Sequence, residues 1–230
     1  MKNKVLIIVG VLAFVILLIV AMVIPQKEVK YNEDLLGISY EIDGNITTDL
    51  KYDTENPLVA MYIEKYGSVV MELYPEVAPN TVNNFISLVK SGFYDNNSFH
   101  RLVPGFVLQG GDPEGNGSGG PGYTIKGEFT NNGFENNLKH EKWVLSMARS
   151  SENDSAGSQF FICLDTASSL DGDYATFGKV IDGFNSINKI VKNERVSDSE
   201  SGKLAQNLVI KKAIVDLNGK DYPEVEKISE

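Results

Sequence analysis

Strand-like alternation of apolar and polar residues dominates the chain beyond its first quarter. Two apolar-rich runs, residues 58–64 and 68–74, are joined by Lys65-Tyr66-Gly67. This arrangement predicts a β-hairpin in which the glycine takes up the backbone angles of the turn. Outside two helical stretches, the remaining pattern is that of short strands and long loops.

Two stretches have helical spacing instead. Residues 79–90 place apolar side chains on one helical face, Pro79 suits a first turn, and Gly92 suits a helix end. A second helix is expected from about residue 182 to residue 192. Many strands with two helices, and no alternating strand-helix repeat, predict a mainly β fold, a closed antiparallel barrel rather than a doubly wound sheet.

The N-terminal segment has a different character. Residues 5–24 contain no charged or hydrogen-bonding side chain, and at about 1.5 Å per residue a helix of this length spans a bilayer core of about 30 Å. We therefore predict a transmembrane anchor in residues 1–24. The alternative is a cleaved signal peptide, but such peptides have shorter apolar regions that end in small residues, and residues 21–25 form a poor cleavage site.

The same segment leads to an expected location. Lysines before the apolar residues favour an N-terminus inside the cell, so we expect a single-pass protein of the cell membrane with its domain outside the cytoplasm, or a secreted domain if the segment is cleaved. The expected organisation is a polar linker at residues 25–56, a globular domain at residues 57–217 and a charged tail at residues 218–230.

The charge balance argues against several partners. The formal net charge is −10, and an acidic surface repels phosphate backbones, so no nucleic acid is expected to bind. Gly115, Gly117 and Gly120 match G-x-G-x-x-G, but strand-like flanks and Pro121 oppose the helix that a nucleotide site requires. No metal or cofactor is expected either, because the two histidines and the single cysteine, Cys163, lack ligand spacing.

The most informative chemistry lies in residues 99–112, where polar groups are interleaved with large apolar residues. Strand alternation puts every second side chain on one face. Shared faces are therefore expected on two strands joined by a Pro-Gly turn: Phe99, Arg101 and Val103 on the first, Val107 and Gln109 on the second. A buried cation is unfavourable unless something pairs with it, so a guanidinium and a carboxamide in an apolar patch indicate a site for a neutral, carbonyl-rich ligand.

This stretch closely resembles the signature of the cyclophilin family of peptidyl-prolyl isomerases. The resemblance continues, in the family's order, through Val144-Leu-Ser-Met-Ala-Arg149, Gly157-Ser-Gln-Phe-Phe-Ile-Cys163 and Leu170-Asp-Gly-Asp-Tyr-Ala-Thr-Phe-Gly-Lys179. It covers roughly residues 57–192 and a closing strand near residues 207–216. It implies an eight-stranded barrel with a helix over each end, and prolyl isomerase activity.

The resemblance also implies roles for individual residues. Arg101 stands at the catalytic position, and Gln109 at the position that holds the substrate backbone. The other substrate-binding positions are Phe106, Val107, Phe161 and Leu170 in the proline pocket, Ala148 and Arg149 on the edge strand that pairs with the peptide, Gln159 beside the groove, and Tyr174 where a histidine is common.

Three positions depart from the best-known eukaryotic pattern. Val107 replaces a methionine, Ser169 a tryptophan and Tyr174 a histidine. The arginine and most of the pocket are intact, and Tyr174 still offers a ring edge and a hydroxyl. Because the tryptophan position helps to hold cyclosporin, sensitivity to that drug does not follow from the resemblance.

The sequence leaves more than one function open. The first is a membrane-tethered isomerase that assists the folding of unfolded or exported proline-containing polypeptides. The second is a non-catalytic chaperone or assembly module that binds proline segments on the same fold, with Arg101 satisfied by a buried carbonyl. The third, a cofactor-dependent enzyme, predicts stabilisation by nucleotides, which we do not expect.

Overall fold

The computed structural model describes residues 41–42, 45–46 and 52–228. The predicted anchor at residues 1–24 and most of the predicted linker lie outside these residues. Within the described residues, no helix combines the length and the apolar character needed to cross a bilayer. In the linker region, β1 (Glu41–Ile42) and β2 (Asn45–Ile46) form a two-stranded antiparallel pair.

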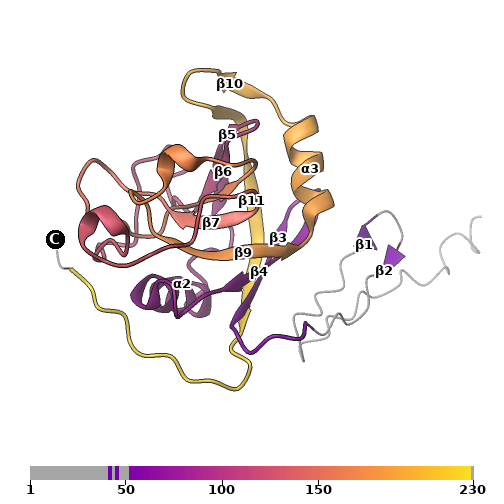
Figure 1. Ribbon diagram of the computed structural model, residues 1–230. Helices are drawn as coiled ribbons and strands as arrows, with labels where there is room; N and C mark the ends of the chain where they lie inside the picture. Colours follow the sequence, from indigo (N-terminus) through magenta and orange to yellow (C-terminus); the bar gives the residue numbers. More distant parts are fainter. Residues whose placement is uncertain (1–40, 43–44, 47–51, 229–230) are drawn as a thin grey trace, which may run out of the picture. The chain divides into compact units, whose positions relative to one another are not determined.

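The globular domain is built on a closed barrel of eight antiparallel strands (Figure 1). The strands are β3 (Leu58–Ile63), β4 (Gly67–Leu73), β5 (Ser98–Val103), β6 (Val107–Gly110), β7 (Val144–Met147), β8 (Phe160–Cys163), β9 (Thr176–Asp182) and β11 (Lys203–Asp216). They follow the order β11-β3-β4-β9-β7-β8-β6-β5, and pairing of β5 with β11 closes the ring. A short strand, β10 (Val196–Asp198), extends the sheet beside β11. The predicted eight-stranded barrel is confirmed.

The hairpin predicted at the start of the domain is present. β3 and β4 pair in continuous register from Leu58 opposite Glu72 to Ile63 opposite Gly67. Left-handed backbone angles occur at Gly67, as predicted, and also at Lys65, where φ is 71°. A lysine rarely adopts this conformation, so the turn contains strain that the sequence pattern does not reveal.

Helix α2 (Pro79–Lys90) has the bounds predicted from its spacing. Its N-cap residue, Ala78, offers no capping side chain. Instead, the buried carboxylate of Glu128 accepts the backbone N–H groups of Asn80 and Thr81, at 3.0 and 2.8 Å, and the Thr81 hydroxyl at 2.7 Å. A negative charge here complements both the unpaired N–H groups and the helix dipole.

Helix α3 (Phe184–Asn193) begins two residues later than predicted. β9 continues to Asp182, and Gly183, with φ of 81°, forms the N-cap. An added Cβ on Gly183 would lie 2.3 Å from the carbonyl oxygen of Ser68, so only glycine fits between this strand and the helix. The apolar face of α3 packs into the core through the buried Ile187.

Apolar side chains fill the barrel in cross-strand layers. One fully buried layer consists of Leu102, Leu108, Leu145 and Ile162. Aromatic rings connect the barrel to α2, where Phe85 lies with its ring centroid 5.1 Å from those of Tyr94, Phe160 and Phe177. The core is therefore continuous from the strands into the helix.

A bulge in β5 changes one predicted face. Phe99 is paired with Gly110 and Arg101 with Gln109, so His100 is an extra residue between the two pairs. Phe99 therefore lies in the main core, on the opposite side of the strand from Arg101, and the prediction that the two share a face is wrong. A bulge shifts the alternation by one residue, and the local sequence pattern does not mark it.

The segment after β11, predicted as a charged tail, follows the domain surface as far as Ile228 (Figure 1). The side chain of Asn80 exchanges two hydrogen bonds of 2.9 Å with the backbone of Glu226, and Thr124 pairs with Ile228. The residues of this segment that pack against the core are Leu217, Tyr222 and Val225. The described part of the tail thus belongs to the folded domain.

Candidate active site

A second apolar cluster lies on the face of β6 and β8 that points away from the barrel interior. Its buried members are Val107, Phe161 and Cys163. Beside it is a groove of about 180 Å³ lined by Arg101, Phe106, Val107, Gln109, Ala148, Arg149, Phe161, Leu170 and Tyr174. The structure thus brings together all the predicted site residues except Gln159, which lies next to Gln109. The predicted shared faces of Arg101 with Val103 and of Val107 with Gln109 are also present.

Two hydrogen bonds fix the guanidinium of Arg101. Its Nε donates to the backbone carbonyl of Ser201 at 2.7 Å, and its Nη1 donates to Oε1 of Gln109 at 3.2 Å. Both acceptors are neutral, and among the described residues Arg101 has no ion-pair partner and Nη2 has no acceptor. Burial lowers the pKa of Arg101, but the ordinary pKa of arginine is so high that the group remains a cation.

A second amide orients the side chain of Gln109. Nε2 of Gln109 donates to Oε1 of Gln159 at 3.0 Å, which leaves Oε1 of Gln109 facing Arg101. Gln159 in turn donates to the carbonyls of Gly117 and Gly119, at 3.0 and 2.9 Å. Gln159 therefore connects the groove to the glycine-rich loop that follows β6.

A buried carboxylate holds this glycine-rich loop. Asp112, only 1 % exposed, accepts the backbone N–H groups of Glu114, Asn116 and Gly117. Burial by itself would raise the pKa of Asp112, but these donors outweigh it and hold the pKa below its usual value. The G-x-G-x-x-G stretch thus wraps around a carboxylate and begins no helix.

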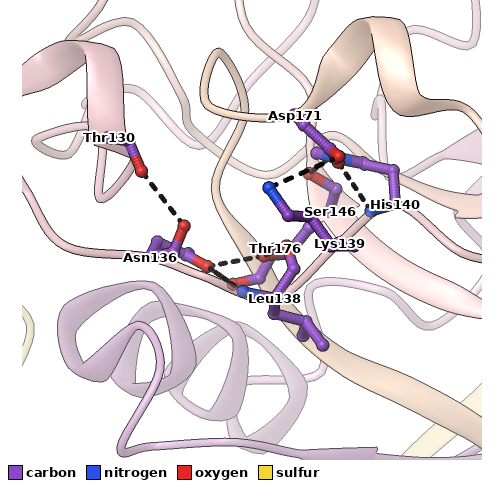
Figure 2. Close-up of polar contacts among 8 residues, drawn as sticks. All are labelled: Thr130, Asn136, Leu138, Lys139, His140, Ser146, Asp171 and Thr176. Carbon is purple, nitrogen blue, oxygen red and sulfur yellow. Dashed lines mark hydrogen bonds and ion pairs between the residues drawn. The ribbon is translucent and has the colours of Figure 1, made fainter.

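A polar network lies behind the groove (Figure 2). The buried His140 has Nδ1 3.0 Å from Oδ1 of Asp171 and Nε2 3.0 Å from Oγ of Ser146. Because a carboxylate only accepts, Nδ1 carries the proton and Nε2 accepts from the serine hydroxyl. The imidazole is stacked with Phe161 at a centroid distance of 6.0 Å and meets Tyr174 edge-on at 6.4 Å.

This network has the order of a serine-histidine-aspartate triad, but its burial gives it another role. Ser146 is completely buried, so a substrate has no access to its hydroxyl. The histidine instead supports the groove from behind, through the ring of Phe161. His140 also holds the segment that carries Leu170, a residue that lines the groove. It binds Asp171, which directly follows Leu170, and its backbone carbonyl accepts the N–H of Ala167 at 2.8 Å.

Arg149 lies between the groove and a second, more polar cavity of about 420 Å³. Its Nε donates to the carbonyl of Asp173 and its Nη1 to the carbonyl of Ser150, both at 2.9 Å. The guanidinium lies 4.8 Å from the ring centroid of Tyr174 and 5.1 Å from that of Phe129. Contacts with neighbouring loops therefore fix this second arginine as well.

Cys163 does not offer an alternative nucleophile. Burial raises the pKa of the Cys163 thiol to about 12, so the sulfur stays protonated and is a poor nucleophile. In the part of the chain that the structure describes, no three His, Cys, Asp or Glu side chains are grouped so as to hold a metal ion.

Comparison with known proteins agrees with this geometry. Residues 58–215 match the family described as cyclophilin type peptidyl-prolyl cis-trans isomerase/CLD. The chain belongs to the cyclophilin family. This cyclophilin is 50 % identical to peptidyl-prolyl cis-trans isomerase B of Bacillus subtilis over 121 residues, which are 53 % of the chain and 81 % of the relative. It is 42 % identical to a Helicobacter pylori peptidyl-prolyl cis-trans isomerase over 130 residues, 56 % of the chain and 77 % of the relative.

Solved structures agree with the fold of this cyclophilin. A cyclophilin type peptidyl-prolyl cis-trans isomerase of Cryptosporidium parvum, crystallised in the presence of the dipeptide Ala-Pro, superposes with a TM-score of 0.61 and 34 % identity. The match covers 69 % of this chain and 98 % of that protein. The family resemblance carried by the four sequence blocks is thus confirmed.

Three contributions to the groove of this cyclophilin are not predicted by its sequence. They are the Ser201 carbonyl on Arg101, the carboxylate of Asp112 in the loop, and His140 behind Phe161. The first acts through a backbone atom, so the residue type carries no signal. The other two are polar residues buried beside apolar ones: Asp112 ends the first matched block and His140 lies just before the second, and only this placement points to the site.

Proposed function

We propose that this cyclophilin accelerates rotation about X-Pro peptide bonds by binding the proline ring in the groove and stabilising the twisted imide with Arg101. The observation that carries the proposal is a fixed cation beside an apolar groove, with Nε and Nη1 held by neutral acceptors and Nη2 left for a ligand. The relative crystallised with Ala-Pro supports a proline-containing peptide as the substrate.

The reaction needs stabilisation of one geometry and no bond cleavage. Rotation faces a barrier of about 18–20 kcal/mol because the amide is conjugated. In the twisted state the proline nitrogen is pyramidal and recovers a lone pair, which a guanidinium N–H can meet more favourably than it meets the planar imide. A charge-assisted hydrogen bond of about 1.5–3 kcal/mol corresponds to about one to two powers of ten in rate. Exclusion of water by the apolar groove strengthens this bond.

The other groove residues suit the rest of an X-Pro segment. Val107 and Phe161 offer apolar surface to the proline ring. Nε2 of Gln109 uses one hydrogen on Gln159 and has a second for a substrate carbonyl. Ala148 and Arg149 are the positions beside which the substrate main chain would run.

The activity is tested with Arg101→Ala on a model X-Pro peptide. We expect kcat/KM to fall about 10- to 100-fold, in line with the loss of one transition-state hydrogen bond, with an unchanged thermal midpoint. The matched control is Arg195→Ala, which removes an exposed arginine and should behave as wild type. Equal rates for wild type and Arg101→Ala would refute the catalytic role, and a wild type that binds the peptide without accelerating rotation would identify the non-catalytic module.

We further propose that the enzyme is tethered by residues 1–24 and acts on exported polypeptides outside the cytoplasm. The support is the run of residues 5–24 without a charged or hydrogen-bonding side chain. Membrane fractionation with an antibody against the domain should find it in the pellet, and protease added to intact cells should degrade it. A protein that stays in the supernatant or is protected in intact cells contradicts the proposal.

A further inference from the structure

The turn between β10 and β11, residues 198–202, lies against Arg101. Figure 1 shows β10 and the start of β11 next to β5, and Lys203 is paired with Arg101 across the two strands. From this turn the carbonyl of Ser201 accepts the hydrogen bond of Arg101 Nε at 2.7 Å. It is the shorter of the two bonds that hold the guanidinium, since the bond to Gln109 measures 3.2 Å.

Asp198 builds this turn with both its side chain and its backbone. Oδ1 accepts the N–H of Glu200 at 3.0 Å, and Oδ2 accepts the hydroxyl of Ser201 at 2.7 Å. The backbone carbonyl of Asp198 accepts the N–H of Gly202 at 2.9 Å. Three hydrogen bonds to one residue therefore determine where the Ser201 carbonyl points.

Gly202 brings the turn close to β5. It has φ of 76°, and an added Cβ would lie 2.5 Å from Cγ2 of Val103 and 3.0 Å from the carbonyl oxygen of Leu102. The carbonyl of Gly202 also accepts the N–H of Leu102 at 2.8 Å. The turn is thus anchored on the strand that carries Arg101, directly beside it.

We infer that the turn at residues 198–202 is a positioning element for Arg101, and that Asp198 is the residue on which its geometry depends. This inference rests on the proposed catalytic role of Arg101. A flexible arginine side chain holds its planar guanidinium in one orientation when two different N–H groups are bound. Ser201 and Gln109 provide these two contacts from opposite neighbours of β5, and they leave Nη2 for the substrate. A misplacement of about 1 Å at a reacting group can lower a rate about 100-fold.

The integrity of the barrel does not explain this arrangement. β10 lies outside the ring of eight strands that closes through β5 and β11. Asp198, Glu200 and Ser201 are exposed, and substitutions at exposed positions usually have small effects on stability. The exposed side chains of this turn contribute little to folding, yet they shape the loop that holds the nearest acceptor of Arg101, and their effect on that residue best explains them.

The test replaces Asp198 in the full chain. Asp198→Ala removes both side-chain hydrogen bonds, and we expect kcat/KM to fall about tenfold, through kcat rather than KM, with the thermal midpoint unchanged. Asp198→Asn keeps an acceptor for Glu200 and a partner for Ser201, and should retain most activity. The matched control is Glu200→Ala, which removes a carboxylate from the same turn and should behave as wild type.

The same substitutions in an Arg101→Lys background show whether Asp198 acts through Arg101. A lysine lacks the Nε–H group that binds Ser201, so Asp198→Ala should not lower the residual activity further. An equal decrease in both backgrounds, as a general loss of stability would give, overturns the inference, and so does the absence of a decrease when Arg101 is present. If Arg101→Ala is fully active, the proposed function itself fails; if it is inactive while Asp198→Ala is normal, only the positioning role fails.

Discussion

Residues that a substrate does not contact fix the orientation of the side chains that line the groove. Phe161 has its ring stacked with the imidazole of His140, and the amide of Gln109 is oriented by Gln159. In a close-packed environment a ring turns only if its neighbours move. The buried hydrogen bonds of His140 to Asp171 and Ser146 therefore give the apolar side of the groove a single orientation.

His140 should make the stability of the domain depend on pH. Burial lowers its pKa below the ordinary value of 6.5, with Asp171 opposing the shift, so the unfolded chain binds this proton more readily than the folded one. The stability contributed by neutral His140 is fully present above about pH 6.5 and is lost as the pH falls through the lower pKa of the folded state. We expect the thermal midpoint to be level above pH 7 and to fall toward pH 5.

Thermal unfolding of His140→Gln over the same pH range provides the comparison. Its midpoint should fall less steeply than that of wild type, although it should still fall, because burial also lowers the pKa of His100. If the thermal midpoints of the two proteins fall in parallel with pH, His140 does not contribute to the pH dependence of stability. Aspartates with lowered pKa values, such as Asp112, act only at lower pH.

Secondary-structure elements were predicted where their pattern is local. The spacing of apolar residues and Pro79 give α2 its observed bounds. The sequence pattern places the start of α3 two residues too early, because Asp182 is the last residue of β9 and its pairing with β4 overrides the helical spacing. The pattern also places Phe99 on the wrong face, because the bulge at His100 arises from the pairing of β5 with β6. Contacts between segments that are far apart in the chain produce no periodic pattern of residues in the sequence.

The candidate site likewise has features that the sequence predicts and features that depend on contacts between distant residues. The resemblance of four sequence blocks to the cyclophilin family implies the groove, and the barrel places these blocks side by side so that each contributes side chains to it. The contact of Ser201 with Arg101 depends instead on a backbone carbonyl a hundred residues away. Any residue type offers such a carbonyl, so the sequence alone gives no reason to choose Ser201.

Glu128 should stabilise α2 from outside the helix. Glu128→Ala leaves the half-buried N–H group of Asn80 and the buried N–H group of Thr81 without their acceptor, which costs about 1–3 kcal/mol in the free energy of unfolding. Urea denaturation of this variant measures the loss. Glu141→Ala, at an exposed position, is the control, and equal midpoints for the two variants would show that the cap is unimportant.

At the scale of the whole molecule, the two ends of the domain are held together. The side-chain amide of Asn218 donates to the backbone carbonyls of Thr54 and Asn56. The side chain of Asn80 donates to the backbone carbonyl of Glu226 and accepts its N–H. Thr54 and Asn56 before β3 and the described residues after β11 therefore belong to the same folded unit as the barrel.

Removal of residues 218–230 should lower stability and spare activity. Burial of a large apolar side chain contributes about 1.5–3 kcal/mol, and the removed segment includes the packed Tyr222 and Val225. None of its described residues, 218–228, lines the groove. We expect a lower thermal midpoint with kcat/KM within about twofold of the full chain, measured at a temperature where both are folded. A large loss of activity under these conditions would connect the tail to the groove.

The closure of the barrel has a consequence for how the enzyme is made. Arg101 lies on β5, whose partner β11 comes from residues 203–216, about a hundred residues later in the chain. When the arginine leaves the ribosome, the strand that completes its surroundings has not yet been synthesised. The surroundings of Arg101 are therefore incomplete until β11 has been translated, and until then the chain's own prolyl bonds rotate spontaneously or with the help of another isomerase.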